Sequence, residues 1–364
     1  MDLNQYLRQM DGMKASDLYI KAYSPVFLRV DGKLRAINDS PVSPEDTEST
    51  MRELLSEAEQ KNFEETLESD IAIAVPDLGR FRVNIYRQMG TIALVFRMIE
   101  SVVPSFEELH LPVKLLEELS LEERGLILVT GIAGSGKSTT IAAMIDYINN
   151  HDRKHIITIE DPIEFAFTDK MSVISQREVG SDTHGFHNAL RHVIRQSPDV
   201  IFIGEMRDYE TIQSAIMAAE TGHLVLSTLH TVDATQTIER IINYYPQHQH
   251  DQVRMQLSLI LKGVISLRLL LKKDKTGRIP ACEVMSLSPT IRKVIREGRT
   301  NDLYDLIKRG EISQMQTFNQ AIVKLYKKGL INEDEAVKYS SNVEELTLQL
   351  KGIYSGGDTF TVDK

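Results

Sequence analysis

The spacing of apolar and polar residues changes once along this chain of 364 residues, near residue 115. Before the change, short runs that alternate apolar and polar residues predict β-strands at residues 70–75, 80–86 and 92–98. The dipeptide Asp31-Gly32 separates two further runs of this kind and predicts a hairpin turn. Residues 1–100 are therefore expected to form a small α+β domain with an antiparallel sheet.

Two helices are expected in the same domain. The first is indicated by Leu3, Leu7 and Met10, which have helical spacing. The second begins where Ser43 can cap a helix and Pro44 can occupy its first position, and it is expected to run to about Phe63. Residues 101–115 hold two prolines and few periodic apolar positions, which is typical of a linker.

After the linker, apolar runs of strand length alternate with helical patterns. Strands are expected at residues 125–130, 155–159, 200–203 and 224–228, and helices at residues 137–149, 186–195 and 209–221. This alternation predicts an α/β domain over residues 116–285 with a mostly parallel sheet. Beyond residue 240 the pattern indicates helices at residues 253–271, 290–296 and 316–327. Residues 286–364 are thus expected to form a helical C-terminal region with a polar end at residues 355–358.

Composition narrows the class of protein. Hydrophobic residues make up 42% and charged residues 26% of the chain, as in ordinary globular proteins. No apolar run reaches the length of a transmembrane helix, and the N-terminus lacks the pattern of a secretory signal, so a cytoplasmic protein is expected. The single cysteine excludes a multi-cysteine zinc site within one chain. A net charge of −10 makes nucleic acid an unexpected partner.

A glycine-rich segment between a predicted strand and a predicted helix carries the clearest chemistry. Residues 131–138 read GIAGSGKS and satisfy the phosphate-binding pattern G-x-x-x-x-G-K-[ST] in full. Backbone N–H groups of such a loop face phosphates, Lys137 is expected to reach the β- and γ-phosphates, and the Ser138 hydroxyl is expected to bind Mg²⁺. The flanking strand and helix argue against a chance glycine-rich turn. The candidate nucleotide-binding residues are Gly131, Ala133, Gly134, Ser135, Gly136, Lys137, Ser138 and Thr139.

Acidic residues follow two of the other predicted strands. Glu160, Asp161 and Glu164 come after the strand at residues 155–159, where one of them could polarise an attacking water or all could form a solvated acidic turn. Glu205 comes just after the strand at residues 200–203. That position suits an acid that holds Mg²⁺ through water, and it would equally suit a surface acid after a buried strand.

Two histidines, His223 and His230, bracket the strand at residues 224–228. A lone histidine is usually structural, but the carboxyl end of this strand is expected at the nucleotide edge of the sheet. Both a structural role and a functional role therefore stay open for these two residues. A metal site is not expected, because no third ligand with suitable spacing accompanies them.

With these elements in hand, the chain resembles the secretion ATPase superfamily, and most closely the pilus retraction motors of the PilT and PilU type. The resemblance covers nearly the whole length. It rests on four boxes in a fixed order, which here read GIAGSGKSTT, ITIEDPIEF, VIFIGEMRD and AAETGHLVLSTLH. It implies a PAS-like N-terminal domain, a RecA-like P-loop NTPase domain, ATP and Mg²⁺ as ligands, and a homohexameric ring.

The resemblance also assigns roles to single residues. It implies that Glu164 is the catalytic base, that Glu205 is the Mg²⁺-associated acid, and that His223 and His230 sense or transmit the nucleotide state. The N-terminal domain of one subunit would supply arginines to the nucleotide of its neighbour. Arg82 is the first candidate, and Arg80 and Arg87 are further ones.

The resemblance implies a cytoplasmic motor at the pilus base that works on an inner-membrane platform protein, with a paralogous retraction ATPase as a further partner. A pilus assembly ATPase is a rival, although such proteins usually carry a four-cysteine zinc element. A type II or type IV secretion ATPase is a second rival, and a non-hydrolysing ring partner is a third. Residues 290–297, TIRKVIRE, correspond to a retraction motif from which they depart at three positions, so a structural and a partner-contact role both stay open.

Overall fold

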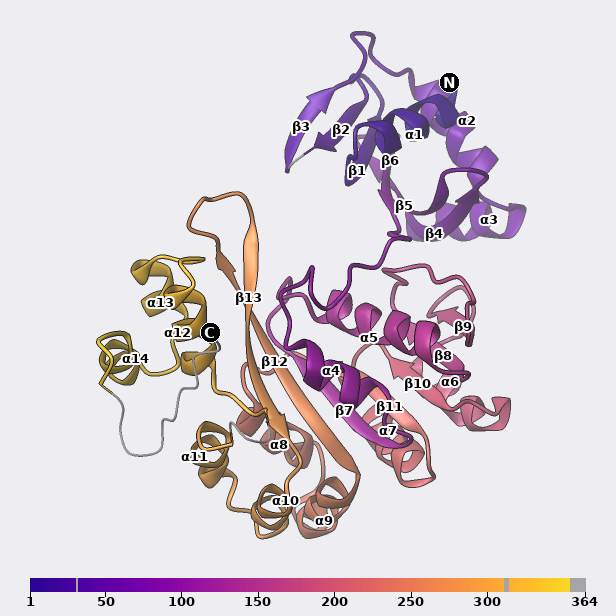
Figure 1. Ribbon diagram of the computed structural model, residues 1–364. Helices are drawn as coiled ribbons and strands as arrows, with labels where there is room; N and C mark the ends of the chain where they lie inside the picture. The colour runs from indigo at the N-terminus through magenta and orange to yellow at the C-terminus, as the bar shows by residue number, and fades with distance from the viewer. Residues whose placement is uncertain (31, 311–313, 354–364) are drawn as a thin grey trace. The chain divides into compact units, whose positions relative to one another are not determined.

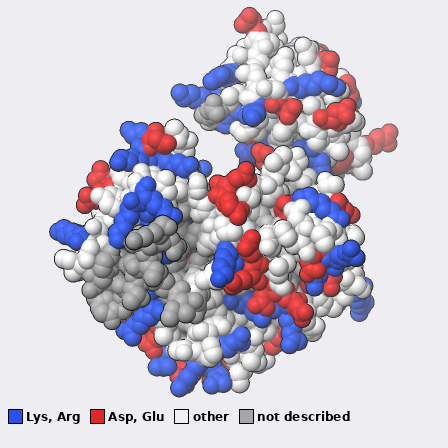
Figure 2. All heavy atoms as spheres, viewed as in Figure 1, with Lys and Arg blue, Asp and Glu red and all other residues white. Residues whose placement is uncertain are grey.

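The computed structural model describes residues 1–30, 32–310 and 314–353 of the chain. These residues fall into two compact units (Figure 1). The first holds Met1–Val102 together with the short segment Glu164–Ala166, and the second holds Val103–Ile163 and the chain from Phe167 onward. On the face drawn in Figure 2, basic and acidic side chains are intermixed over each unit, as on ordinary solvated surfaces.

The first unit contains a six-stranded antiparallel sheet with strand order β3-β2-β1-β6-β5-β4. A core that includes Phe63, Phe81 and Phe96 is buried between this sheet and three helices. The elements are α1 (Leu3–Gly12), β1 (Asp17–Lys21), β2 (Phe27–Val30), β3 (Lys33–Ala36), α2 (Pro44–Leu54), α3 (Glu57–Thr66), β4 (Glu68–Val75), β5 (Gly79–Gln88) and β6 (Thr91–Met98).

The helix expected from Ser43 to Phe63 is two helices, so that prediction was wrong. Leu55 leaves the helical conformation with ψ 133°, and Ser56 then caps α3 in a capping box with Glu59. The box satisfies the first N–H groups of a new helix, which favours a break over a continuous helix. The expected hairpin pairs Val30 with Lys33, although Asp31 of its turn lies outside the described residues.

The second unit is built on a seven-stranded sheet with strand order β13-β12-β7-β11-β10-β8-β9 (Figure 1). All neighbouring strands are parallel except β12 and β13, which are antiparallel. This confirms the expected α/β fold with a mostly parallel sheet. The strands are β7 (Gly125–Thr130), β8 (His155–Glu160), β9 (Val173–Glu178), β10 (Val200–Ile203), β11 (Leu224–Leu229), β12 (Leu261–Leu271) and β13 (Arg278–Ser286).

Helices cover both faces of this sheet and leave two apolar cores, one on each face. One core holds residues of α4 (Val113–Ser120) and α5 (Lys137–His151). The other holds residues of α6 (Phe186–Val193), α7 (Tyr209–Glu220), α8 (Ala234–Asn243), α9 (His250–Ile260), α10 (Pro289–Arg296) and α11 (Leu303–Lys308). A third core joins the sheet to α12 (Phe318–Lys327), α13 (Glu333–Tyr339) and α14 (Val343–Leu350).

The helix expected over residues 253–271 is also wrong, because α9 ends at Ile260 and β12 begins at Leu261. Strand β13 was not expected at all. Strand β12 lies between β7 and β13 and is buried on both faces, so its sequence reads as a nearly continuous apolar run. Such a run cannot be told from a buried helix by periodicity. The polar end expected at residues 355–358 lies outside the described residues.

None of the helices in the described residues is both long enough and apolar enough to span a bilayer.

Candidate nucleotide-binding site

The glycine-rich loop follows β7, the strand that lies between β11 and β12. Its first residue, Gly131, has φ +145° and is packed against the neighbouring strand β12. A Cβ atom at this position would lie 2.5 Å from Ser135 Oγ and 2.6 Å from the carbonyl oxygen of Leu267. Glycine is therefore required at the point where β7 turns into the loop.

The end of the loop forms the start of α5. Gly134 and Gly136 have φ values of +72° and +97°, a conformation that suits glycine, and α5 begins directly afterwards at Lys137. The Lys137 ammonium is buried and donates hydrogen bonds to the carbonyl oxygens of Gly131 (2.9 Å) and Ile132 (3.0 Å). The loop thus curls around its own lysine and places a helix N-terminus beside it.

These features fit a bound phosphate chain. The Ser135 hydroxyl is buried and has no hydrogen-bond partner within the described part of the chain, so it is available to a ligand. Ser138 and Thr139 lie in the first turn of α5, where backbone N–H groups have no carbonyl oxygen of a preceding helical turn to bind. A helix N-terminus of this kind attracts phosphate through its N–H groups and its dipole.

An acid and a histidine lie together at the carboxyl ends of β10 and β11. Glu205 follows β10, and its carboxylate has two basic neighbours. Arg207 Nη2 lies 2.6 Å from Glu205 Oε1, and His230 Nε2 lies 3.4 Å from Glu205 Oε2. The Glu205 side chain is only 12% exposed, so its carboxylate is held in place by these two neighbours.

His223 lies at the other end of the same strand, immediately before β11. Its Nδ1 atom is 2.9 Å from the carbonyl oxygen of Ala218 and 3.2 Å from the Thr221 hydroxyl, so it closes the turn after α7. The six residues of β11 separate the two histidines by roughly 20 Å. The glycine-rich loop follows the carboxyl end of β7, which is parallel to β11. Of the two histidines, only His230 therefore lies at the edge of the sheet that holds this loop. His223 thus lies at the opposite edge of the sheet and closes the turn after α7, and the nucleotide-sensing role that the resemblance implies for it stays a prediction.

The second acidic segment divides between the two units. Glu160 ends β8 in the second unit, where its carboxylate accepts a 2.6 Å hydrogen bond from the Thr158 hydroxyl. Glu164 belongs to the first unit with its two following residues, and the Ala166 N–H donates to the carbonyl oxygen of Glu100. Arg82 is also in the first unit, on β5, with its Nε 3.3 Å from Asp70 Oδ1.

Arg207 is a neighbour of Glu205 that the sequence did not single out. Its signal was weak, since it is one basic residue two positions beyond an acid. The structure shows that these two positions bring the guanidinium to the carboxylate.

A strand, a glycine-rich loop and a helix N-terminus on one parallel sheet, with an acid at the end of a nearby strand, define the class of P-loop nucleotide-binding proteins with a RecA-like domain.

Comparison with known proteins identifies the family within this class. The model of the type II/IV secretion system protein family matches residues 1–342. The type IV pilus ATPase PilU of Pseudomonas aeruginosa is 41% identical over 351 residues, which are 96% of this chain and 92% of that protein. The protein described as type IV pilus retractation ATPase PilT of the same organism is 44% identical over 336 residues, covering 92% of this chain and 97% of PilT.

A solved structure agrees with these matches. The crystal structure of the pilus retraction motor PilT with bound ADP superimposes with a TM-score of 0.89 at 46% identity, covering 95% of this chain and 99% of that one. The chain belongs to the type II/IV secretion system protein family.

Proposed function

We propose that this protein is a hexameric motor that hydrolyses ATP to power retraction of a type IV pilus. The observation that carries the proposal is the P-loop around Lys137, in a chain that is similar to retraction ATPases over nearly its whole length. In P-loop NTPases a loop of this kind binds the phosphates of a nucleotide. The bound ADP in the PilT crystal structure supports the same ligand here.

The residues of the second unit have separate roles in this proposal. The loop N–H groups and Lys137 bind the phosphates, and Ser138 and Glu205 are the residues that would hold Mg²⁺. The ion supplies charge neutralisation for the phosphate oxygens when it is bound. His230 orients Glu205, because its Nε2 lies 3.4 Å from that carboxylate. The phosphate-binding residues are Gly131, Ala133, Gly134, Ser135, Gly136, Lys137, Ser138 and Thr139.

Two residues of the first unit complete the proposed chemistry. Glu164 orients and deprotonates the attacking water as general base. Arg82, supplied by a neighbouring subunit, neutralises phosphate charge while the γ-phosphate is present. Hydrolysis then removes the charge that holds the arginine, which couples turnover to movement of one domain against another. This coupling is the reason for proposing a ring, and the expected site of action is the cytoplasmic side of an inner-membrane platform protein.

The proposal distinguishes hydrolysis from nucleotide binding alone. We expect Lys137→Ala to lose both ATPase activity and nucleotide affinity, whereas Glu164→Ala keeps the affinity and loses turnover by about 100-fold or more, as expected for loss of a general base. Steady-state ATPase rates and binding of a fluorescent nucleotide measure the two effects. Glu65→Ala, at an exposed position of α3, is the matched control and should behave as wild type. Full turnover in Glu164→Ala would refute the assignment of the base.

A second experiment separates retraction from assembly or secretion. Cells that lack the gene should carry more pili and should not twitch if the protein retracts pili, whereas bald cells would point to an assembly ATPase. An accessory role predicts normal pili until a paralogous motor is also removed. A protein that binds ATP without hydrolysing it would be a ring partner and would contradict the motor proposal.

A further inference from the structure

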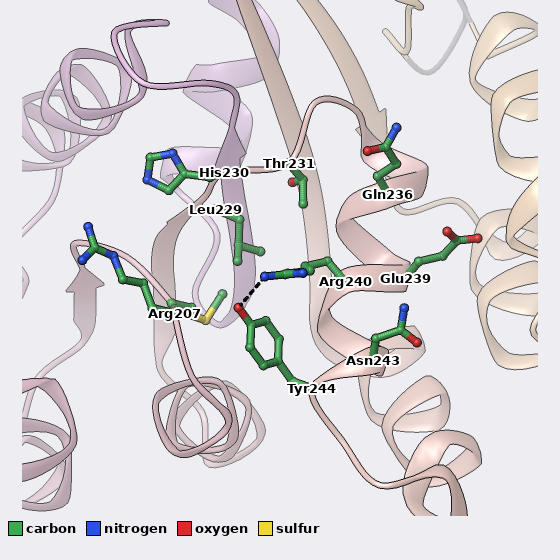
Figure 3. A pocket seen from close by; sticks show the side chains of 10 residues that line it. Arg207, Leu229, His230, Thr231, Gln236, Glu239, Arg240, Asn243 and Tyr244 are labelled. Carbon is green, nitrogen blue, oxygen red and sulfur yellow. Dashed lines mark hydrogen bonds between the residues drawn. The ribbon is translucent and has the colours of Figure 1, made fainter.

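A pocket beside Glu205 is lined mainly by polar and cationic side chains (Figure 3). Its volume is about 580 Å³, within the range of small-molecule sites. It is formed where the loops after β10 and β11 face α8. The lining residues are Met206, Arg207, Leu229, His230, Thr231, Gln236, Glu239, Arg240, Asn243 and Tyr244.

Arg240 lines this pocket without an acidic partner among the residues that the structure describes. Its Nη2 donates to the Tyr244 hydroxyl at 3.2 Å, and its guanidinium lies 5.0 Å from the centre of the same ring. It makes no ion pair with any residue that the structure describes. The guanidinium thus has several donors to spare at the wall of a polar pocket.

The acidic residue that lines the pocket does not neutralise Arg240. Glu239 points away from Arg240 in Figure 3, and its carboxylate accepts a 2.9 Å hydrogen bond from the Thr300 hydroxyl. On the opposite wall, Arg207 and His230 share one carboxylate, that of Glu205. The Arg240 side of the pocket therefore presents a guanidinium that is not paired with an acid of the described residues, which favours an anion there.

A backbone hydrogen bond joins the start of the phosphate-binding loop to a residue that lines the pocket. The Gly131 N–H donates to the carbonyl oxygen of Leu229, the last residue of β11, and the next two residues, His230 and Thr231, line the pocket. Glu205, which follows β10, is joined to the pocket through Arg207, which lines it. Figure 3 shows Arg207 and His230 on one side of the pocket, and Arg240 with its hydrogen bond to Tyr244 apart from them.

We propose that this pocket is a second oxyanion site, which holds the inorganic phosphate released by the ATP hydrolysis proposed above. Arg240 and the Tyr244 hydroxyl bind the phosphate oxygens, and Arg207 and His230 turn toward it from Glu205. The ligand class follows from the donors, because guanidinium groups bind phosphate oxygens in a two-pronged arrangement. The proposal rests on the proposed function only for the origin of the phosphate, and the binding site itself can be tested without turnover.

The test is direct binding of inorganic phosphate to the full-length protein by isothermal titration. Lys137→Ala removes the lysine of the phosphate-binding loop, so phosphate that still binds to this variant occupies another site. We expect the remaining site to be weakened roughly tenfold or more when Arg240→Gln is added, the usual effect of losing a hydrogen bond from a charged group. Arg191→Gln, at an exposed position of α6, is the matched control and should leave binding unchanged.

A second measurement uses wild-type protein saturated with a non-hydrolysable ATP analogue, in which the γ-phosphate position of the loop is filled. Phosphate should still bind, and Arg240→Gln should still weaken it. The proposal is overturned if Lys137→Ala or the analogue abolishes all phosphate binding, or if Arg240→Gln binds as the control does. An inactive enzyme that still shows Arg240-dependent binding would contradict the proposed function and leave the oxyanion site standing.

Discussion

Replacing Gly131 by alanine should destabilise the protein far more than the same change at Gly134. A Cβ at Gly131 would lie 2.6 Å from the Leu267 carbonyl oxygen, which belongs to a strand paired on both sides. That strand cannot move without breaking its pairing with β7 or β13. At Gly134 nothing lies within 4 Å of the added atom.

The magnitude can be worked from these two environments. The backbone at Gly131, with φ +145°, costs an alanine about 1–3 kcal/mol, and the overlap with backbone adds about 1–3 kcal/mol. Gly134 has φ +72° and open space, so alanine there costs only about 1 kcal/mol. The free energy of unfolding should therefore fall by about 4 kcal/mol in Gly131→Ala and by about 1 kcal/mol in Gly134→Ala.

Urea unfolding followed by circular dichroism measures the difference. With a denaturant slope of about 3 kcal/mol per molar urea, the two midpoints should differ by about 1 M. Because both changes fall in the same loop, a general effect of loop substitution would shift them equally. Equal midpoints would show that the close approach of the loop to β12 is not a constraint.

Two other predictions concern buried groups of β13. Burial raises the pKa of the Glu283 carboxyl from 4.5 to about 7, so the folded state favours the protonated form. The stability that this protonated carboxyl contributes is fully present below pH 4.5 and is lost as the pH rises through 7. Glu283→Gln keeps the oxygen that accepts a hydrogen bond from the Ala234 N–H. In urea unfolding, this variant should be more stable than the wild type by up to about 3 kcal/mol at pH 8 and should differ little from it at pH 4.5. Equal effects at both pH values would contradict this prediction. Burial also raises the pKa of the Cys282 thiol to about 12. A thiol reagent at about pH 8 should therefore modify this cysteine only after the protein unfolds. Modification of the native protein at the rate of a free thiol would contradict the burial of Cys282.

The parts of the site that could be predicted from the sequence are those that depend on local backbone demands. A strand, Gly131, Gly136 and Lys137 specify the loop almost by themselves, because only glycine adopts those backbone angles without strain. The meeting of Glu205 and His230 could be anticipated since parallel strands end at the same edge of a sheet. His223 precedes the same strand, so the same rule places it at the opposite edge of the sheet.

Other parts depend on contacts between distant segments and could not be predicted. The pairing of Arg207 with Glu205 needs side-chain directions that no spacing rule gives. The placement of Glu164 and Arg82 in one unit, and of the loop in the other, follows from how the chain folds back. Their roles therefore came from resemblance to a family and remain proposals.

Strand β12, whose apolar run predicts a helix, is the strand against which the phosphate-binding loop packs. Gly131 touches Leu267 of β12, and the Thr130 hydroxyl lies 2.8 Å from the Ser266 hydroxyl of the same strand. The next residue, Arg268, lies over the Phe318 ring of α12 at 3.8 Å and donates to the Tyr339 carbonyl oxygen. Three consecutive residues of β12 thus contact the end of β7, the loop and the C-terminal helices. A change of loop conformation on nucleotide binding would therefore displace β12 and, through Arg268, the helices that follow.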